Sequence, residues 1–186
     1  MLTKWAKESL KIRGGNSVVP GLSNPKGCIT AKHYNGDDIY VTTPYVAIGS
    51  TSFVAGNIST ESVGVVVGTG DTPATETDYN LANKITSGLT GTVSQDYGYD
   101  AVNNVNYTYM TVTLTNTTDT DIIVKEIGMY VVYGTATTLG GDVSTGGGRR
   151  KCALTDRTVL ETPVTVPANG SAVIRYQFDF PTVNPT

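Results

Sequence analysis

Few residues in this sequence have the types and spacing that catalysis requires. His33 is the single histidine among 186 residues, and no motif places a nucleophile beside it. A hydrolytic triad would have to depend on it, because histidine is the usual base of such triads. The sixteen Asp and Glu residues could supply a carboxylate pair for sugar cleavage, but no motif singles out two of them. The sequence therefore predicts no enzyme, with no catalytic residue and no cofactor.

One loop contains acids whose spacing could suit a metal ion. Asp71, Glu76 and Asp78 follow the segment Gly68-Thr69-Gly70, and oxygen atoms of carboxylates and backbone carbonyls are the ligands that Ca²⁺ prefers. The spacing does not match an EF-hand, and the glycines lack the following Lys and helix of a phosphate-binding loop. We expect solvated acids and predict no metal site, and calcium binding by these three acids is the alternative.

Two cysteines, Cys28 and Cys152, lie far apart in the sequence. No apolar stretch follows Lys4 and Lys7, so we expect no signal peptide and two partly buried thiols. A disulfide between the two cysteines is the alternative. No run of eighteen apolar residues occurs in the sequence, which predicts no membrane-spanning segment.

The chain divides by charge into a basic start and an acidic body. Residues 1–33 contain six Lys or Arg and one Glu, whereas residues 34–148 contain two Lys and twelve acids. This distribution favours docking of the first segment onto the body of its own chain or of a neighbour. Nucleic acid binding is disfavoured, because the body that would face the phosphates is acidic. Arg149, Arg150 and Lys151 are expected to be solvated loop charges, and ion pairing with another subunit is the alternative.

The first 37 residues are predicted to form a short helix and an extended arm. Residues 2–13 have an apolar face and are followed by two glycines, as at many helix ends. Prolines and glycines make residues 14–37 irregular. So short a helix needs something to pack on, and we predict an interface with a neighbouring subunit through Trp5, Leu10 and Arg13. A contact of Trp5 within its own chain is the alternative.

Residues 38–186 are predicted to form one all-β domain. The clearest strand patterns are a hairpin over residues 108–133 with its turn at 116–121, and an amphipathic strand over 172–180. The first half of the domain is predicted to have a central strand at Gly64–Val67 and a strand over 91–95 that is followed by a turn at 96–100. The second half is predicted to have a strand over 152–160 with a polar turn at Thr155 and Asp156, an edge strand between Pro163 and Pro167, and a turn at 168–170. The absence of crossover helices predicts an antiparallel β-sandwich, similar to a jelly roll.

Two sets of aromatic and apolar residues have particular predicted roles. We expect a loop to plug the end of the core with Tyr79, Leu81 and Ile85. Four tyrosines could offer stacking faces to a glycan of a host surface, namely Tyr97, Tyr99, Tyr107 and Tyr109. For Tyr107 and Tyr109 we favour ordinary positions on one face of a strand.

Three segments occur in a fixed order between residues 65 and 167. They are Val65-Val66-Val67-Gly68-Thr69-Gly70-Asp71-Thr72-Pro73 with Asp78-Tyr79-Asn80-Leu81, then Val124-Lys125-Glu126-Ile127-Gly128-Met129-Tyr130, and then Leu154-Thr155-Asp156-Arg157-Thr158-Val159-Leu160 with Thr162-Pro163-Val164-Thr165-Val166-Pro167. In this order and spacing they resemble a group of small virion structural proteins of tailed bacteriophages. The resemblance extends over about residues 60–180 and leaves out the N-terminal arm.

The resemblance implies a non-enzymatic subunit of a phage particle, built as a β-sandwich and used in symmetric copies. We expect a homo-oligomer in the tail or neck region, made in the host cytoplasm, whose partners are copies of itself and other virion proteins. A capsid decoration or head-fibre protein and a module that binds host glycans are the alternatives. We expect no direct contact with nucleic acid or membrane.

Glu126 lies within an otherwise apolar strand, where an unpaired carboxylate would be costly. Arg157 is the nearest candidate partner in the segments that carry the resemblance. We therefore predict a structural ion pair between Glu126 and Arg157. Simple exposure of Glu126 on the face of a sheet is the alternative.

Overall fold

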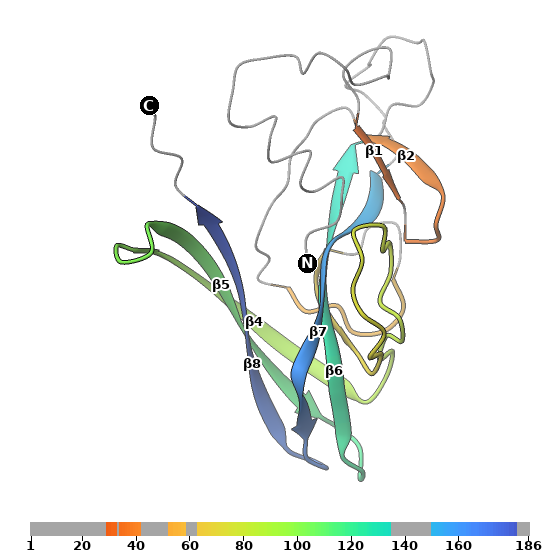
Figure 1. The fold of residues 1–186 in the computed structure, drawn as a ribbon. Coiled ribbons are helices and arrows are strands. Elements are labelled where there is room, and N and C mark those ends of the chain that lie inside the picture. Colours follow the sequence, from red (N-terminus) through yellow and green to blue (C-terminus); the bar gives the residue numbers. More distant parts are fainter. Residues whose placement is uncertain (1–28, 33, 42–51, 59–62, 135–149, 182–186) are drawn as a thin grey trace.

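The computed structural model describes residues 29–32, 34–41, 52–58, 63–134 and 150–181, and this part of the chain is all-β. No helix occurs among these residues. The strands are β1 (Ile29–Lys32), β2 (Asp38–Val41), β3 (Gly64–Gly68), β4 (Leu89–Asp100), β5 (Val105–Asn116), β6 (Ile122–Gly134), β7 (Arg150–Val166) and β8 (Ser171–Pro181). Figure 1 shows their arrangement.

Two three-stranded antiparallel sheets pack against each other and share one core. Their strand orders are β3–β6–β7 and β4–β5–β8, and β1 and β2 form a separate pair. Burying an aliphatic or aromatic side chain contributes about 1.5–3 kcal/mol, so the interior between the sheets is the main source of stability. Its buried members include Val65, Val67, Leu89, Val93, Met110, Val112, Leu114, Val124, Ile127, Met129, Val166, Ile174, Tyr176 and Phe178. The sandwich-like architecture agrees with the expected fold class, and the jelly-roll topology stays a prediction.

The predicted hairpin over residues 108–133 is wrong in its pairing. Both strands exist, but β5 pairs with β4 and β8, whereas β6 pairs with β3 and β7. The turn at 116–121 carries the chain from one sheet to the other. Asn116 holds it there, because its side-chain amide donates to the carbonyl oxygens of Thr120 and Val166 at 2.7 and 3.1 Å.

β3 is buried at all five positions but lies at the edge of its sheet, not at the centre. Only β6 pairs with it along its length. Loop segments satisfy the other edge, since Val65 exchanges backbone hydrogen bonds with Ser52 and Val54, and Val67 accepts one from Ile85. A strand whose backbone is bonded on both sides has the unbroken apolar pattern of a central strand.

β4 is longer than predicted, because residues 96–100 belong to the strand and form no turn. The turn lies at 101–104, where Asn104 adopts a positive φ of 53°. The Asp100 carboxylate accepts hydrogen bonds from the backbone N–H groups of Val102 and Asn103 at 2.9 and 3.2 Å. Asp and Asn favour turns through such bonds, and the turn begins five residues later in the chain than expected.

β7 runs without interruption through Thr155 and Asp156, where a polar turn was predicted. The register against β6 shifts at this point, as Met129 faces Asp156 and Tyr130 faces Leu154. Thr155 is therefore the extra residue of a β-bulge, which absorbs the polar residues without breaking the strand. The remaining predictions for this region are confirmed: the segment between Pro163 and Pro167 lies on an edge strand, and Asn169 turns with a φ of 52°.

Of the three loop residues predicted to plug the end of the core, only Ile85 packs against it. Ile85 packs against the core between the sheets, whereas Leu81 is buried in a second cluster with Val66, Tyr130, Cys152 and Leu154, and Tyr79 is 42% exposed. Tyr79 lies instead over Gly36, where a Cβ atom would approach its ring to 3.3 Å.

Residues 29–41 are not wholly irregular, because β1 and β2 pair in register from Ile29 with Val41 to Lys32 with Asp38. This hairpin crosses residue 37, the predicted boundary between the arm and the sandwich. It is tied to the sandwich by the backbone N–H of Tyr34, which donates to the carbonyl oxygen of Cys152 at 3.2 Å. The predicted helix at 2–13 lies outside the described residues, and the division into two parts stays a prediction.

Candidate functional site

The Glu126–Arg157 ion pair is present and fully buried. Arg157 Nε donates to Glu126 Oε2 at 2.7 Å, and the two side chains are 3% and 0% exposed. β6 supplies the glutamate and the neighbouring strand β7 supplies the arginine. A buried charge is tolerated when it is paired and its remaining hydrogen-bonding capacity is used.

The remaining capacity of Glu126 is used by the backbone of the loop at 69–85. Its Oε1 accepts from the N–H groups of Gly70 and Asn83 at 3.1 and 2.7 Å, and its Oε2 accepts from Ala82 at 3.0 Å. The carboxylate thus ties the two ends of the loop together. We call Glu126, Arg157 and the loop groups bonded to them the ion-pair cluster.

Arg157 binds a second carboxylate, which sequence reasoning missed. Its Nη1 lies 2.8 Å from Asp78 Oδ2, and its Nη2 donates to the carbonyl oxygen of Thr72 at 2.8 Å. Burial alone would raise the pKa of Asp78, but hydrogen bonds from Thr75 and the charge of Arg157 outweigh it and lower that pKa. Asp78 was identified in the sequence only as a possible metal ligand, and its place in a loop hid its arginine partner 79 residues away.

The glycines of the loop are needed for close approach to Glu126 rather than for a special backbone conformation. Neither Gly68 nor Gly70 has a positive φ. A Cβ atom on Gly70 would lie 2.6 Å from Glu126 Oε1, and one on Gly68 would also meet this carboxylate. The absence of side chains at these two positions makes room for the buried carboxylate.

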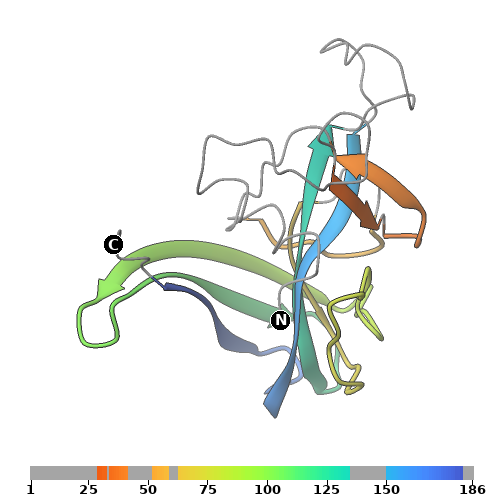
Figure 2. The ribbon, with the colours of Figure 1, turned by 45° about the horizontal axis from the view of Figure 1, so that its top comes forward.

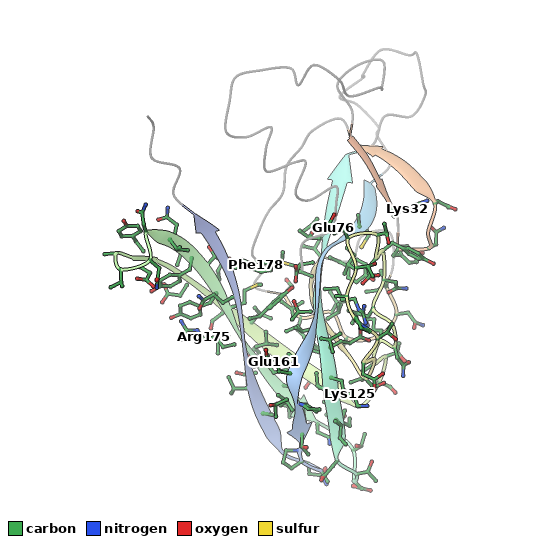
Figure 3. All side chains as sticks on the ribbon, viewed as in Figure 1. Lys32, Glu76, Lys125, Glu161, Arg175 and Phe178 are labelled. Atoms are coloured by element: carbon green, nitrogen blue, oxygen red, sulfur yellow. The ribbon has the colours of Figure 1, made fainter. Side chains whose placement is uncertain are left out.

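The three loop acids do not converge on a metal site. Asp71 pairs with Lys125 at 2.9 Å on the surface, Asp78 pairs with Arg157, and Glu76 is exposed. Within the described ranges, no group of three or more His, Cys, Asp or Glu side chains is placed to hold a metal ion. Figure 3 shows Lys125 and Glu76 at separate places beside β6 and the loop.

Another buried polar contact joins one sheet to the other. The Tyr176 hydroxyl on β8 donates to Asp156 Oδ2 on β7, and Thr158 Oγ1 donates to the same oxygen at 3.2 Å. Burial, together with the charge of Asp156, raises the pKa of Tyr176 well above its ordinary value. Asp156 was predicted to lie in a turn, and its neighbours Thr155 and Arg157 give no local signal of a buried position.

The four tyrosines considered for glycan binding do not form one surface. In the register of the sheet, Tyr97 and Tyr99 of β4 pair with Thr108 and Asn106, whereas Tyr107 and Tyr109 pair with Gly98 and Asp96. Because paired residues point to the same face of a sheet, two tyrosines lie on each face. This confirms same-face positions for Tyr107 and Tyr109 and excludes a platform of all four rings.

The outer face of this sheet carries a ladder of polar and aromatic contacts. The rings of Tyr107 and Tyr109 stack with centroids 6.0 Å apart, and the Arg175 guanidinium lies 3.7 Å from the centre of the Tyr109 ring. The Tyr109 hydroxyl donates to Asp96 Oδ2 at 2.9 Å, a bond that raises the pKa of Tyr109. Figure 3 shows Arg175 on this side of β8 and Phe178 on the side of the core.

The inner face of the same sheet is open at its far end. The β4–β5 hairpin extends away from β6 and β7 in both views of the fold (Figures 1 and 2). We call its end, residues 95–107, the wing. Tyr97 is 77% exposed and Tyr99 is 54% exposed, although both lie on the face that is apolar and buried closer to β6 and β7. An exposed aromatic pair on a core-type face is typical of a binding surface.

Several predicted site residues cannot be placed. Trp5, Leu10, Arg13 and Arg149 lie outside the described residues, as do His33 and Cys28, and Arg150 and Lys151 begin β7 but their side chains are outside the described part. The interface predicted for them stays a prediction. Cys152 is a buried thiol, and burial raises its pKa to about 12.

Comparisons of the chain with protein-family models, curated proteins and solved structures found no match. Among the residues that the structure describes, no helix has the length and apolar character needed to span a membrane.

Proposed function

We propose that this chain is a non-enzymatic structural subunit of a tailed-phage virion. It assembles as a homo-oligomer in the tail or neck region, through its N-terminal arm and the surfaces of its sandwich. A capsid decoration or head-fibre role is the alternative within the same class. The proposal includes the helix at 2–13 and a jelly-roll-like topology.

The observation that carries the proposal is that the segments resembling phage virion proteins are one physical unit in three dimensions. Residues 65–73 and 78–81, 124–130 and 154–160 supply every member of the ion-pair cluster apart from Ala82 and Asn83, the two residues that follow the first segment. Each short motif is ordinary β-sheet sequence. Their convergence on one buried network gives a physical reason for their joint occurrence.

The fold supports an assembly role in a second way. The two sheets share one core and are linked by the buried contact of Asp156 with Tyr176, while the Glu126–Arg157 pair ties β6 to β7 within one sheet, and together these contacts make a rigid block. A particle subunit needs such a block, because its surfaces must hold a fixed geometry in many copies.

Removal of residues 1–33 tests the proposal. We expect the shortened chain to keep cooperative thermal unfolding and yet fail to enter particles when it replaces the full chain during phage growth. Particle composition by mass spectrometry measures incorporation, and labelled antibody in electron micrographs gives the position in the particle. Normal incorporation of the shortened chain would contradict the role of the arm.

A module for host-surface glycans is the second candidate, favoured by the exposure of Tyr97 and Tyr99 on the wing. Aromatic rings bind the apolar faces of sugars by stacking. A glycan array tests it: a specific signal that the pair of substitutions Tyr97→Ala and Tyr99→Ala abolishes would support it. Binding that survives both substitutions would place any glycan site elsewhere.

A further inference from the structure

We propose that the wing binds residues 1–28 of a second copy of this chain, along the free edge of β4 and over the rings of Tyr97 and Tyr99. The inference rests on the proposed function as a self-assembling subunit and names the surface that receives the arm. The wing is thus the surface to which we assign docking of the arm.

Among the described strands, β4 has a partner along only one of its two edges. β4 pairs with β5 at every position from Leu89 to Asp100, and among the described strands none pairs with its other side. Edge strands are usually protected by Pro, Lys or a covering segment, since an exposed edge invites another strand. β4 contains neither Pro nor Lys nor Arg. An extended segment can therefore add to this sheet by main-chain hydrogen bonds.

The inner face beside this edge offers aromatic contact area. Tyr97 lies in one row of the sheet with Thr108 and Phe178, and Phe178 is buried in the core. The face thus continues the core outward beyond the reach of the other sheet. The Tyr99 ring is held in place, because its hydroxyl donates to Asn104 Oδ1 at 2.7 Å. A ring that is already ordered loses little freedom when a partner covers it.

The outer face of the wing is already covered. The Tyr107 ring lies over Gly98, where a Cβ atom would meet the hydroxyl at 2.5 Å, and Tyr109 is engaged with Asp96 and Arg175. A docking segment can therefore bind along the edge of β4 and on the inner face of the wing.

Charge selects the basic arm as the occupant. Residues 85–124, which include the whole wing, contain four Asp and no Lys, Arg or His, whereas residues 1–28 contain five Lys or Arg and one Glu. The arm also brings Trp5, an aromatic residue of the kind that anchors interfaces. Pairing of β4 with β4 of a second copy is disfavoured, because it would bring Asp96 and Asp100 of the two copies together, and like charges across strands repel.

The test uses the full-length protein with a photo-crosslinking side chain at the wing, Tyr97→p-benzoylphenylalanine. Copies grown with heavy and with light nitrogen are mixed, illuminated and digested, and mass spectrometry identifies the crosslinked peptides. We expect crosslinks from position 97 to residues 1–28 that join a heavy to a light copy. The control places the same crosslinker at Val173, which is exposed on the outer face of β8, and should not capture this segment.

A variant without the acidic charges of the wing tests how much electrostatic attraction contributes to binding of the arm. Asp96→Asn with Asp100→Asn removes both charges and keeps one acceptor oxygen at each position, for the backbone N–H groups of Tyr97 and Val102. We expect it to lower the crosslink yield by about threefold, as is typical for the loss of exposed charge pairs. An unchanged yield overturns the electrostatic selection of the arm.

The outcomes separate this inference from the proposed function. Crosslinks within one copy only, or from position 97 to another segment, overturn the wing as the receiving surface. If the protein still sediments as an oligomer in that case, the assembly role stands without it. A monomer with no crosslinks between copies overturns the wing inference and argues against the assembly role as well.

Discussion

Arg157 binds two carboxylates at once through different nitrogen atoms of its guanidinium. Nε pairs with Glu126, Nη1 pairs with Asp78, and both distances are below 3 Å. Because the planar guanidinium presents its donors in fixed directions, the two acids are held in one geometry. The side chain is also almost completely buried, so its removal would leave Glu126 without its counter-charge.

We therefore expect Arg157→Ala to lower the free energy of unfolding by about 3–5 kcal/mol, the usual cost of breaking a buried pair from one side. Urea unfolding followed by fluorescence measures it. Lys125→Ala is the matched control, because Lys125 lies next to Glu126 on β6 but pairs with Asp71 on the surface. Its unfolding midpoint should stay close to that of the wild type. Equal effects of the two substitutions would contradict a structural role of the buried pair.

Asp78 gives the cluster a dependence on pH. Its pKa is lowered in the folded chain below the ordinary value of 3.8, so the folded state favours the ionised carboxylate. This contribution to stability is fully present above the unfolded pKa and is lost as pH falls through the lowered folded pKa. We expect stability to fall as the solution is acidified below about pH 4, with Asp78→Asn less stable at neutral pH and less sensitive to acid.

Chemical unfolding at a series of pH values measures this difference. Asp100→Asn serves as a comparison, since Asp100 also has a lowered pKa, caused by hydrogen bonds with Asn103, but lies in the exposed turn of the wing. Identical acid profiles for the wild type and Asp78→Asn would show that Asp78 does not contribute.

At the scale of elements, β7 and β8 belong to different sheets and are joined by the buried Tyr176–Asp156 contact. Tyr176→Phe keeps the ring and removes the hydroxyl, so Asp156 loses a donor in the interior. We expect a loss of about 1–3 kcal/mol in the free energy of unfolding, measured by urea denaturation. Tyr109→Phe removes a comparable hydroxyl from the outer face, where water can replace it, and should change stability little. A neutral effect of Tyr176→Phe would mean that the contact is replaceable.

The strands themselves could largely be predicted from the sequence, because alternation along 171–181 and the valine run of β3 are local patterns. Their pairing could not. The run 116–121 has the turn formers of a hairpin, yet it connects two sheets, since Asn116 bonds to Val166 far away in the chain. Local patterns give the period of a strand, whereas its partners depend on contacts distant in sequence.

Some contacts of the candidate site could also be predicted from the sequence, and others could not. The Glu126–Arg157 pair could be predicted because a lone acid in an apolar strand demands a partner. Asp78 and Asp156 could not be assigned, since an acid in a loop and an acid beside a threonine both look solvated in the sequence. The exposure of Tyr97 and Tyr99 was also beyond prediction, because it depends on how far the opposite sheet extends.

At the scale of the whole molecule, opposite charges on the arm and the body should make self-association sensitive to salt. Residues 1–33 have an excess of five positive charges and residues 34–148 an excess of ten negative charges. Attraction between exposed charges is screened over about 10 Å at 0.1 M salt and about 3 Å at 1 M. We expect the oligomer to dissociate progressively as salt rises over this range, measured by sedimentation velocity at constant protein concentration.

A variant with Lys4→Glu and Lys7→Glu should be weakly associated at low salt and respond less to added salt, because the attraction has been removed from one side. Circular dichroism of the same samples shows whether the sandwich stays folded, which separates dissociation from unfolding. Association that tightens with salt would instead indicate apolar contacts as the main force. In that case the exposed tyrosines of the wing, rather than the charges of the arm, would determine how copies of the chain recognise each other.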